Sequence, residues 1–189
     1  MTSSERTDPL PLFPLQTVLF PGGLLGLKVF EARYLDLVSS CLREQRPFGV
    51  VCLRQGVEVG AGDVAFEDIG VTAHLLDVDS AQAGILQVRC VGGERFAIEG
   101  TPQRQDDGLW MAKVRTLPAD EASMPAPEVH GSVAALARAI ARLRSQGAMP
   151  FQEPLRLDDA GWVANRWCEI LPIPLAAKQK LMADRKSVV

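Results

Sequence analysis

The chain has 189 residues, of which 47% are hydrophobic and 23% are charged, with a formal net charge of -3 and a pI of about 5.4. This length and composition are typical of a globular protein with one large or two small domains. The acidic balance argues against nucleic acid as a partner, because nucleic-acid-binding domains normally carry a broad basic surface. We expect no membrane association, since no apolar run reaches roughly 18 residues. The charged start MTSSERTDP does not fit a secretory signal, so we expect a cytoplasmic protein.

Proline is frequent in the first strand-like segment, at Pro9, Pro11 and Pro14. Because proline cannot donate the amide hydrogen bond that a central strand needs, we expect an edge or irregular strand here. Pro21 and Gly22 fit the two central positions of a type II turn, where proline fixes φ and glycine takes a positive φ. The chain is therefore expected to turn sharply after its first strand.

Two regular elements are expected after this turn. The apolar run over 24–30 predicts a buried strand. The spacing of apolar residues over 31–45 predicts an amphipathic helix. Its apolar face would carry Tyr34, Leu37, Val38, Cys41 and Leu42.

Five further segments carry strand signals, because they are short, rich in Val, Ile and aromatic residues, and separated by Gly, Asp and Pro clusters. They are 48–53, 70–78, 85–90, 95–99 and 109–116. Apolar and polar residues alternate over 86–90, as in a half-buried antiparallel strand. Gly92 and Gly93 predict the turn of a hairpin that leads into 94–99. The first part of the chain is therefore expected to be rich in β-structure.

The composition changes after Leu117, where prolines appear among Ala, Asp, Glu and Ser residues. Such a stretch is typical of a linker. We therefore expect a β-rich domain over 1–118, a linker over 119–131 and a helical subdomain over 132–189.

Three helices are expected beyond the linker. Ser132 is a suitable cap for the first helix, which would run to about Ser145. Asp158 or Asp159 would begin the second helix. Prolines separate it from a third helix over roughly 175–185. These helices would form a small bundle.

The segment LPLFPLQTVLFPGGLLGLKVFEARY, residues 10–34, resembles the opening signature of the Lon protease amino-terminal domain family. That signature includes a Leu-Pro-Leu-Phe-Pro-Leu start, a Phe-Pro-Gly turn and a Phe-Glu-x-Arg-Tyr helix start. Other matching strings follow in the family's order, namely FGVV at 48–51, GVTAHL at 70–75, GGERFAI at 92–98 and LPIPLAAKQKL at 171–181. Because five strings in order cover almost the whole chain, the chain is identified as a member of this family.

The resemblance implies an α+β fold. Its first part would be a compact, partly open antiparallel β-barrel of the pseudouridine-synthase-and-archaeosine-transglycosylase-like (PUA-like) type, with one inserted helix. A carboxy-terminal helical bundle would follow. Periodicity by itself predicts only a β-rich part followed by an α-helical part.

Complete Lon proteases join this domain to an ATPase and a peptidase, but neither is expected here. None of the five lysines follows a glycine, which excludes the phosphate-binding loop G-x-x-x-x-G-K-[ST]. Nothing resembles the family's peptidase domain. We therefore expect a stand-alone, bacterial-type recognition domain that is not an enzyme and needs no cofactor.

The resemblance leads to a functional hypothesis of non-catalytic polypeptide binding, with an adaptor or chaperone-like role in protein quality control. Unfolded or exposed polypeptide segments would be the partners. A Lon-type protease is a further candidate partner, and self-association is left open.

Candidate polypeptide-binding residues cluster around the turn and the helix start. They are Leu24, Leu25, Leu27, Phe30, Arg33 and Tyr34. Their side chains suit apolar contact supplemented by pairing at a β-sheet edge. The same residues are equally suitable for a core, and both interpretations stay open.

Charged residues in apolar surroundings need partners. Glu31 and Arg95 are therefore interpreted as a structural charge cluster, in which an arginine ties the helix start to the barrel through Glu31 or backbone carbonyls. The alternative is an exposed Arg33 that contacts bound polypeptide.

A small-molecule-binding module is the alternative function, because a cleft between barrel and helices is a common ligand site. Trp162 or Trp167 would line such a cleft. A metal site is not expected, since His74 and His130 lie far apart without metal-ligand spacing. The four cysteines lack a C-x-x-C motif and are interpreted as reduced core residues.

Overall fold

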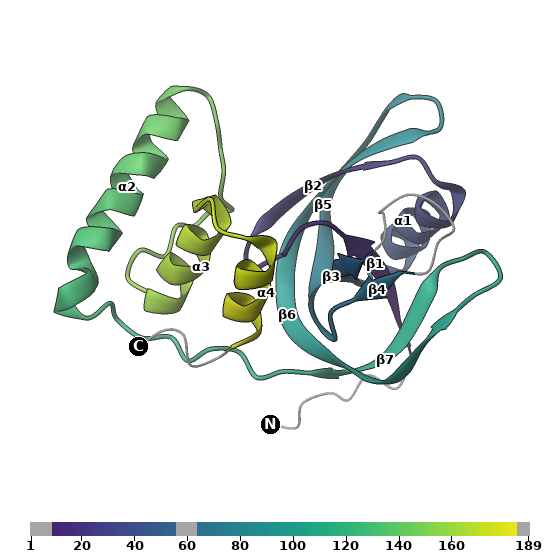
Figure 1. Cartoon of the computed structure of the whole chain (residues 1–189). Helices are drawn as coiled ribbons and strands as arrows, with labels where there is room; N and C mark the ends of the chain where they lie inside the picture. Colours follow the sequence, from purple (N-terminus) through teal and green to yellow (C-terminus); the bar gives the residue numbers. More distant parts are fainter. Residues whose placement is uncertain (1–8, 56–63, 185–189) are drawn as a thin grey trace.

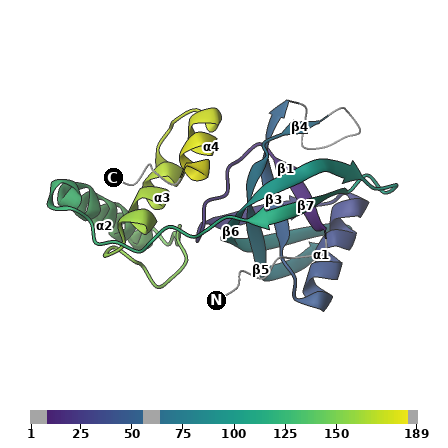
Figure 2. The ribbon, with the colours of Figure 1, turned by 90° about the horizontal axis from the view of Figure 1, so that it is seen from below.

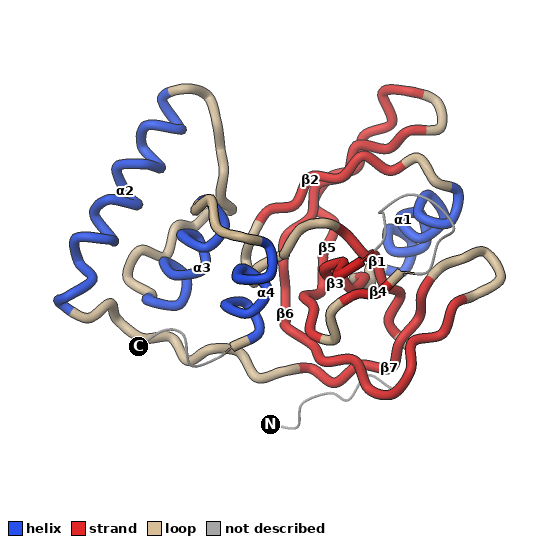
Figure 3. Tube along the Cα trace, viewed as in Figure 1, coloured by secondary structure: helices blue, strands red, loops and turns tan. Residues whose placement is uncertain are grey.

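The computed structural model describes residues 9–55 and 64–184. In chain order the elements are β1 (Leu10–Leu15), β2 (Leu24–Val29), α1 (Ala32–Glu44), β3 (Phe48–Gln55), β4 (Ala65–Phe66), β5 (Ile69–Gln82), β6 (Ile85–Arg104), β7 (Trp110–Thr116), a 3-10 turn (Pro127–Val129), α2 (His130–Ser145), α3 (Ala160–Ile170) and α4 (Leu175–Ala183). The strands form one body, and α2, α3 and α4 lie together beside it (Figures 1 and 3). Helix α1 packs on the opposite side of the strands from these three helices (Figure 2).

The strands form a seven-stranded sheet that closes into a ring. Strand β1 pairs with both β7 and β3, and the circuit continues through β5 and β6. All pairings are antiparallel except the one between β1 and β3. This ring with its inserted helix α1, followed by three helices, confirms the α+β fold class.

The expectation of an edge position for β1 is wrong. Residues 10–12 of this strand pair with β7, and residues 12–15 pair with β3. Each half of the strand therefore has one flank without a ladder. Proline is tolerated where its nitrogen faces such a flank, which explains how Pro11 and Pro14 fit inside a closed sheet.

The expected hairpin at Gly92 and Gly93 is also wrong, because both lie inside the continuous strand β6. A β-carbon at Gly92 would come within 2.2 Å of the carbonyl oxygen of Phe20, and one at Gly93 within 2.6 Å of Thr72 Oγ1. The glycines therefore permit close approach of neighbouring chain segments. The turn between β5 and β6 falls earlier, at Gly84, which has a φ of 76°.

The type II turn is confirmed. Gly22 has a φ of 73°, and the amide of Gly23 donates to the carbonyl of Phe20 at 2.9 Å. The amide of Gly22 donates to the carbonyl of Gly92, and the amide of Gly92 donates to the carbonyl of Gly23, both at 2.8 Å. This two-against-one pattern is a G1 β-bulge, and it fixes the beginning of β2 against β6.

Helix α1 begins and ends one residue inside the expected range of 31–45. It buries four of the five expected side chains, namely Tyr34, Leu37, Val38 and Cys41. Leu42 is 50% exposed, so the apolar face is narrower than predicted. The buried face packs on the barrel core, where the ring of Tyr34 stacks on Phe13 with centroids 3.9 Å apart.

The three carboxy-terminal helices occur as expected, with one change. The 3-10 turn leads directly into α2, so Ser132 lies inside the helix and is not its cap. Asp159 caps α3 by accepting hydrogen bonds from the amides of Gly161 and Trp162. Within residues 9–55 and 64–184, no helix is long and apolar enough to cross a membrane.

Helix α4 is fastened to the barrel. The guanidinium of Arg95 on β6 donates to the carbonyl of Met182 at 3.2 Å, and Gln179 donates to the carbonyl of Ile69 at 2.9 Å. The side chain of Met182 belongs to the same apolar cluster as the barrel core. The helices are therefore positioned directly against the strands, and the spaces between the two parts form candidate sites.

Candidate polypeptide-binding groove

A groove of about 490 Å³ lies between the β1–β2 connection and the α3–α4 turn. Its lining is mainly apolar and includes Val18, Leu24, Leu25, Phe151, Ile170 and Ile173. Ile170 is 39% exposed at the rim, and the adjacent Leu171 is 41% exposed. The groove therefore offers accessible apolar surface.

Strand β2 begins in this groove and has a free edge. Among the described residues it pairs only with β6. The amide of Gly92 donates to the carbonyl of Gly23. Because backbone groups of an antiparallel strand point to the same neighbour at every second residue, those of Leu25, Leu27 and Val29 also bond to β6. The amides and carbonyls of Leu24, Gly26 and Lys28 then face the free edge. An extended chain could pair with these groups.

Gly26 lies in the middle of β2 and is exposed. It does not have a positive φ, and a β-carbon there would meet no atom within 4 Å. Neither backbone conformation nor packing therefore requires glycine at this position. The position therefore has room for a small side chain, and it leaves the free edge of β2 uncovered.

The structure places the predicted apolar residues in three different surroundings. Leu24 and Leu25 line the groove. Leu27 is half-buried against the barrel core. Phe30 is 50% exposed at the far end of β2, outside the groove lining. Only the first two therefore meet in one concave site.

Tyr34 is not an accessible contact, because its side chain is 4% exposed within the core. This corrects its assignment to a binding surface. Arg33 is also largely enclosed, with 11% of its side chain exposed. Its guanidinium pairs with Glu31 at 2.8 Å and donates to the carbonyl of Gly108 at 3.0 Å. Arg33 therefore ties the start of α1 to the turn between β6 and β7.

Glu31 and Arg95 do not form one cluster. Glu31 pairs with Arg33, whereas Arg95 pairs with Asp120 at 2.6 Å and donates to the carbonyl of Pro118 at 3.2 Å. The expected structural use of an arginine at the helix start holds for Arg33. Arg95 instead joins the barrel to the segment after β7 and to α4.

The sequence analysis missed a buried ion pair beneath the groove. Arg166 on α3 is fully buried, and its Nη2 donates to Glu169 Oε1 and to the carbonyl of Pro21, both at 2.8 Å. Its guanidinium lies 5.7 Å from the ring centre of Phe151 and 5.5 Å from that of Trp162. In sequence this looks like an ordinary surface pair three residues apart, so no local signal marks it.

Glu169 forms part of the groove wall. Burial raises the pKa of its carboxyl group to about 7, although Arg166 and Lys178 act in the opposite direction. Burial likewise lowers the pKa of Arg166. The raised pKa of Glu169 and the lowered pKa of Arg166 both indicate that the cost of desolvation outweighs the attraction within this pair. A β-carbon on Gly23 would lie only 2.2 Å from Oε1 of Glu169, so the turn before β2 packs closely against the carboxylate.

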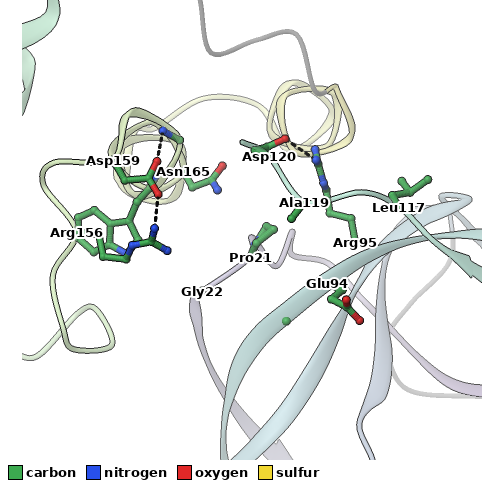
Figure 4. Close-up of a pocket in the computed structure, with 13 residues that line it drawn as sticks. Pro21, Gly22, Glu94, Arg95, Leu117, Ala119, Asp120, Arg156, Asp159 and Asn165 are labelled. Atoms are coloured by element: carbon green, nitrogen blue, oxygen red, sulfur yellow. Dashed lines mark hydrogen bonds and ion pairs between the residues drawn. The ribbon is translucent and has the colours of Figure 1, made fainter. Parts of the chain in front are cut away.

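A second pocket, of about 240 Å³, lies between barrel and helices and has Pro21 and Gly22 in its lining (Figure 4). Two ion pairs border it, Arg95 with Asp120 and Arg156 with Asp159 at 2.8 Å. Trp162 lines this pocket. Trp167 is not among its lining residues and donates its indole N–H to the carbonyl of Ser132.

The four cysteines lie where burial raises the pKa of the thiol. Cys41, Cys52, Cys90 and Cys168 are all free. Burial raises the pKa of Cys41 and Cys52 to about 11 and that of Cys90 to about 12. These three thiols are therefore protonated at neutral pH and are poor nucleophiles. No three His, Cys, Asp or Glu side chains of residues 9–55 and 64–184 gather as metal ligands would.

The fold is a ring of strands with one inserted helix and three docked helices. Its groove and the free edge of β2 are features that suit binding. The family model of the ATP-dependent protease La (LON) substrate-binding domain matches residues 9–187, and the chain belongs to this family. Within these 189 residues the match leaves no room for a further domain.

Two relatives are similar to this chain in sequence. Lon protease of Paraburkholderia phytofirmans is 28% identical over 188 residues, which is 96% of this chain and 23% of that protein. Protein cereblon of Xenopus tropicalis is 27% identical over 127 residues, which is 65% of this chain and 26% of that protein. The chain thus spans about a quarter of the length of these relatives.

Two solved structures share the fold. The Lon N-terminal domain protein from Xanthomonas campestris is 31% identical, with a TM-score of 0.75, and the match covers 95% of this chain and 92% of that chain. The N-terminal domain of the Mycobacterium avium complex Lon protease is 16% identical, with a TM-score of 0.61, covering 94% and 92%. The second likeness concerns the fold alone.

Proposed function

We propose that this chain binds unfolded or exposed polypeptide segments without chemistry of its own, as an adaptor or chaperone-like factor in protein quality control. The observation that carries this proposal is the free edge of β2 opening into an apolar groove. Membership of a substrate-binding domain family supports the same class of partner. A Lon-type protease is a further candidate partner.

Binding would combine two kinds of contact. An extended segment adds to the sheet by exchanging backbone hydrogen bonds with Leu24, Gly26 and Lys28, and these bonds are independent of the segment's sequence. The apolar side chains of the segment enter the groove against Leu24, Leu25 and Ile170. Broad recognition of unfolded chains follows, because the backbone pairing is general and the groove selects only for apolar character.

The decisive test changes one backbone amide. Gly26→Pro removes an N–H that faces the free edge and leaves the ladder between β2 and β6 intact. We expect its affinity for a reduced, carboxymethylated protein that stays unfolded to fall by roughly tenfold, the effect of one lost hydrogen bond. Fluorescence anisotropy of the labelled unfolded protein, without ATP and at moderate salt, measures the affinity.

Gly26→Ala is the matched control, because alanine keeps the amide and the site has room for a methyl group. We expect it to bind as the unchanged protein does. Circular dichroism melting of both variants checks that the fold persists. Equal affinity of the folded Gly26→Pro and Gly26→Ala variants would contradict pairing at this edge, and no saturable binding by the unchanged protein would contradict the function itself.

A small-molecule-binding role is the second candidate, favoured by the pocket that Trp162 lines (Figure 4). Its size suits a ligand smaller than a drug-sized molecule, since sites for drug-sized ligands start near roughly 300 Å³. The two bordering ion pairs suit a ligand that carries both charges. A thermal-shift screen of free amino acids and related zwitterions discriminates between the two roles, because the polypeptide groove predicts no response to them.

A further inference from the structure

We propose that the groove takes up a proton together with its polypeptide segment, and that the proton resides on the Glu169 carboxylate. Acidification would then strengthen binding. This inference rests on the proposed function, because it concerns the same groove. The proton comes from the buffer, and no covalent step is involved.

The position of Glu169 makes its carboxylate sensitive to an occupant. Its side chain retains 19% exposure, and this residue forms the groove wall together with Phe151 and Lys178. An apolar segment in the groove removes the remaining water from the carboxylate. Loss of water favours the neutral form of a carboxyl group. Occupation of the groove therefore raises the pKa of Glu169 further.

The charged groups around Glu169 are few. Arg166 comes from the same helix, and Lys178 comes from α4 with its Nζ donating to the carbonyl of Glu169 at 2.9 Å. The β1–β2 connection approaches the carboxylate at Gly23, and the loop before α3 contributes the uncharged Phe151 to the groove. No second carboxylate is among the groove-lining residues.

Arg166 can tolerate the loss of its counterion because it has other partners. The carbonyl of Pro21 still accepts its Nη2 proton, and the rings of Phe151 and Trp162 lie within cation–π range. The Nε and Nη1 groups are buried without hydrogen-bond partners even when Glu169 is charged. These two groups are unsatisfied in either protonation state of Glu169, so protonation of the carboxylate changes only the Nη2 contact of Arg166.

Thermodynamic linkage fixes the sign of the effect. The carboxyl of the free protein titrates at about 7, and that of the complex titrates at a higher pH. Affinity is then constant above both pKa values, rises as pH falls between them, and is constant again below both. The total gain is about tenfold for each unit by which occupation raises the pKa.

The experiment measures binding of the reduced, carboxymethylated unfolded protein at pH 6, 7 and 8 by the unchanged protein and by Glu169→Gln. We expect the dissociation constant of the unchanged protein to fall several-fold from pH 8 to pH 6. The glutamine variant should show a much smaller change, because its amide does not titrate. Titration of the unfolded partner is common to both proteins and cancels in the comparison.

Calorimetry provides a readout that needs no variant. The binding enthalpy at pH 7, measured in two buffers with different ionisation enthalpies, gives the number of protons taken up. We expect a net uptake of a fraction of one proton.

Lys178→Met removes a cation that lowers the pKa of Glu169, so the pH dependence of binding should move to higher pH.

The outcomes separate the two proposals. Binding without proton uptake, or with the same pH dependence in the unchanged protein and Glu169→Gln, overturns the proton coupling and leaves polypeptide binding intact. Absence of binding at all three pH values overturns both. Proton uptake that disappears in Glu169→Gln supports the coupling.

Discussion

At the scale of single residues, burial decides what the charged side chains do. Arg33 and Arg95 both follow the rule that an enclosed guanidinium finds acceptors. Arg33 pairs with the nearby Glu31 and also donates to a carbonyl 75 residues away, and Arg95 donates to a carbonyl 87 residues away. The sequence predicted that these charges needed partners and suggested Glu31, but it could not identify the distant acceptors. Glu169 and Arg166 passed unnoticed, because a pair three residues apart on a helix is normally exposed.

The raised pKa of Glu169 predicts a pH dependence of stability. Burial raises the pKa of the folded carboxyl to about 7 from its ordinary value of 4.5, so the folded state binds more protons than the unfolded state between these values. Its contribution is fully present below the unfolded pKa and is lost as pH rises through about 7. We expect Glu169→Gln to lower the free energy of unfolding, relative to the unchanged protein, by more at pH 6 than at pH 8.

Urea denaturation of both proteins at these two pH values measures the difference. A matched control is Glu121→Gln, because Glu121 is exposed and its substitution should not alter the pH profile. A stability difference between Glu169→Gln and the unchanged protein that is the same at both pH values would contradict the raised pKa.

At the scale of elements, periodicity located most strands and helices, whereas the turn predicted at Gly92 and Gly93 was wrong. A Gly-Gly pair between two strand-like segments is a strong hairpin signal. In this chain the same pair lies inside β6, where the backbone of Phe20 and the side chain of Thr72 approach too closely for a β-carbon. Local sequence does not distinguish a glycine needed for a turn from one needed for close approach.

Gly92→Ala tests this interpretation. A β-carbon would lie 2.2 Å from the carbonyl oxygen of Phe20, which is backbone and cannot rotate away. We expect the free energy of unfolding to fall by about 1–3 kcal/mol, as for other overpacked sites. Gly26→Ala, which meets no atom within 4 Å, should change it by less than about 0.5 kcal/mol. Similar unfolding free energies for the two variants would contradict the close approach at Gly92.

At the scale of the whole molecule, the helices and the barrel share buried contacts. Arg95 is 4% exposed and bonds to Met182 of α4, to Pro118 and to Asp120. Gln179 and Met182 add a hydrogen bond and apolar contact to the barrel. Division into a barrel over 1–118 and helices over 132–189 stays a prediction, and these contacts link the two parts across it.

Arg95→Ala tests the link between the two parts. Asp120 and two carbonyls lose their donor, so we expect a loss of about 3 kcal/mol in unfolding free energy and a lower melting temperature. Arg115→Ala is the control, because its side chain is 60% exposed and pairs with Glu99 at the surface. An unchanged melting temperature of Arg95→Ala, together with lost polypeptide binding, would instead make Arg95 a binding residue.

The sequence by itself determined the family, the order of elements and most element boundaries. These follow from local patterns, such as the Pro21–Gly22 turn and the spacing of apolar residues in α1, which depend on neighbouring residues alone. Tertiary structure decided the rest. It made β1 part of a closed ring, gave β2 a free edge, and brought residues 16–25 and 150–178 together as one groove. Pairing and burial depend on segments distant in sequence, so no local pattern specifies them.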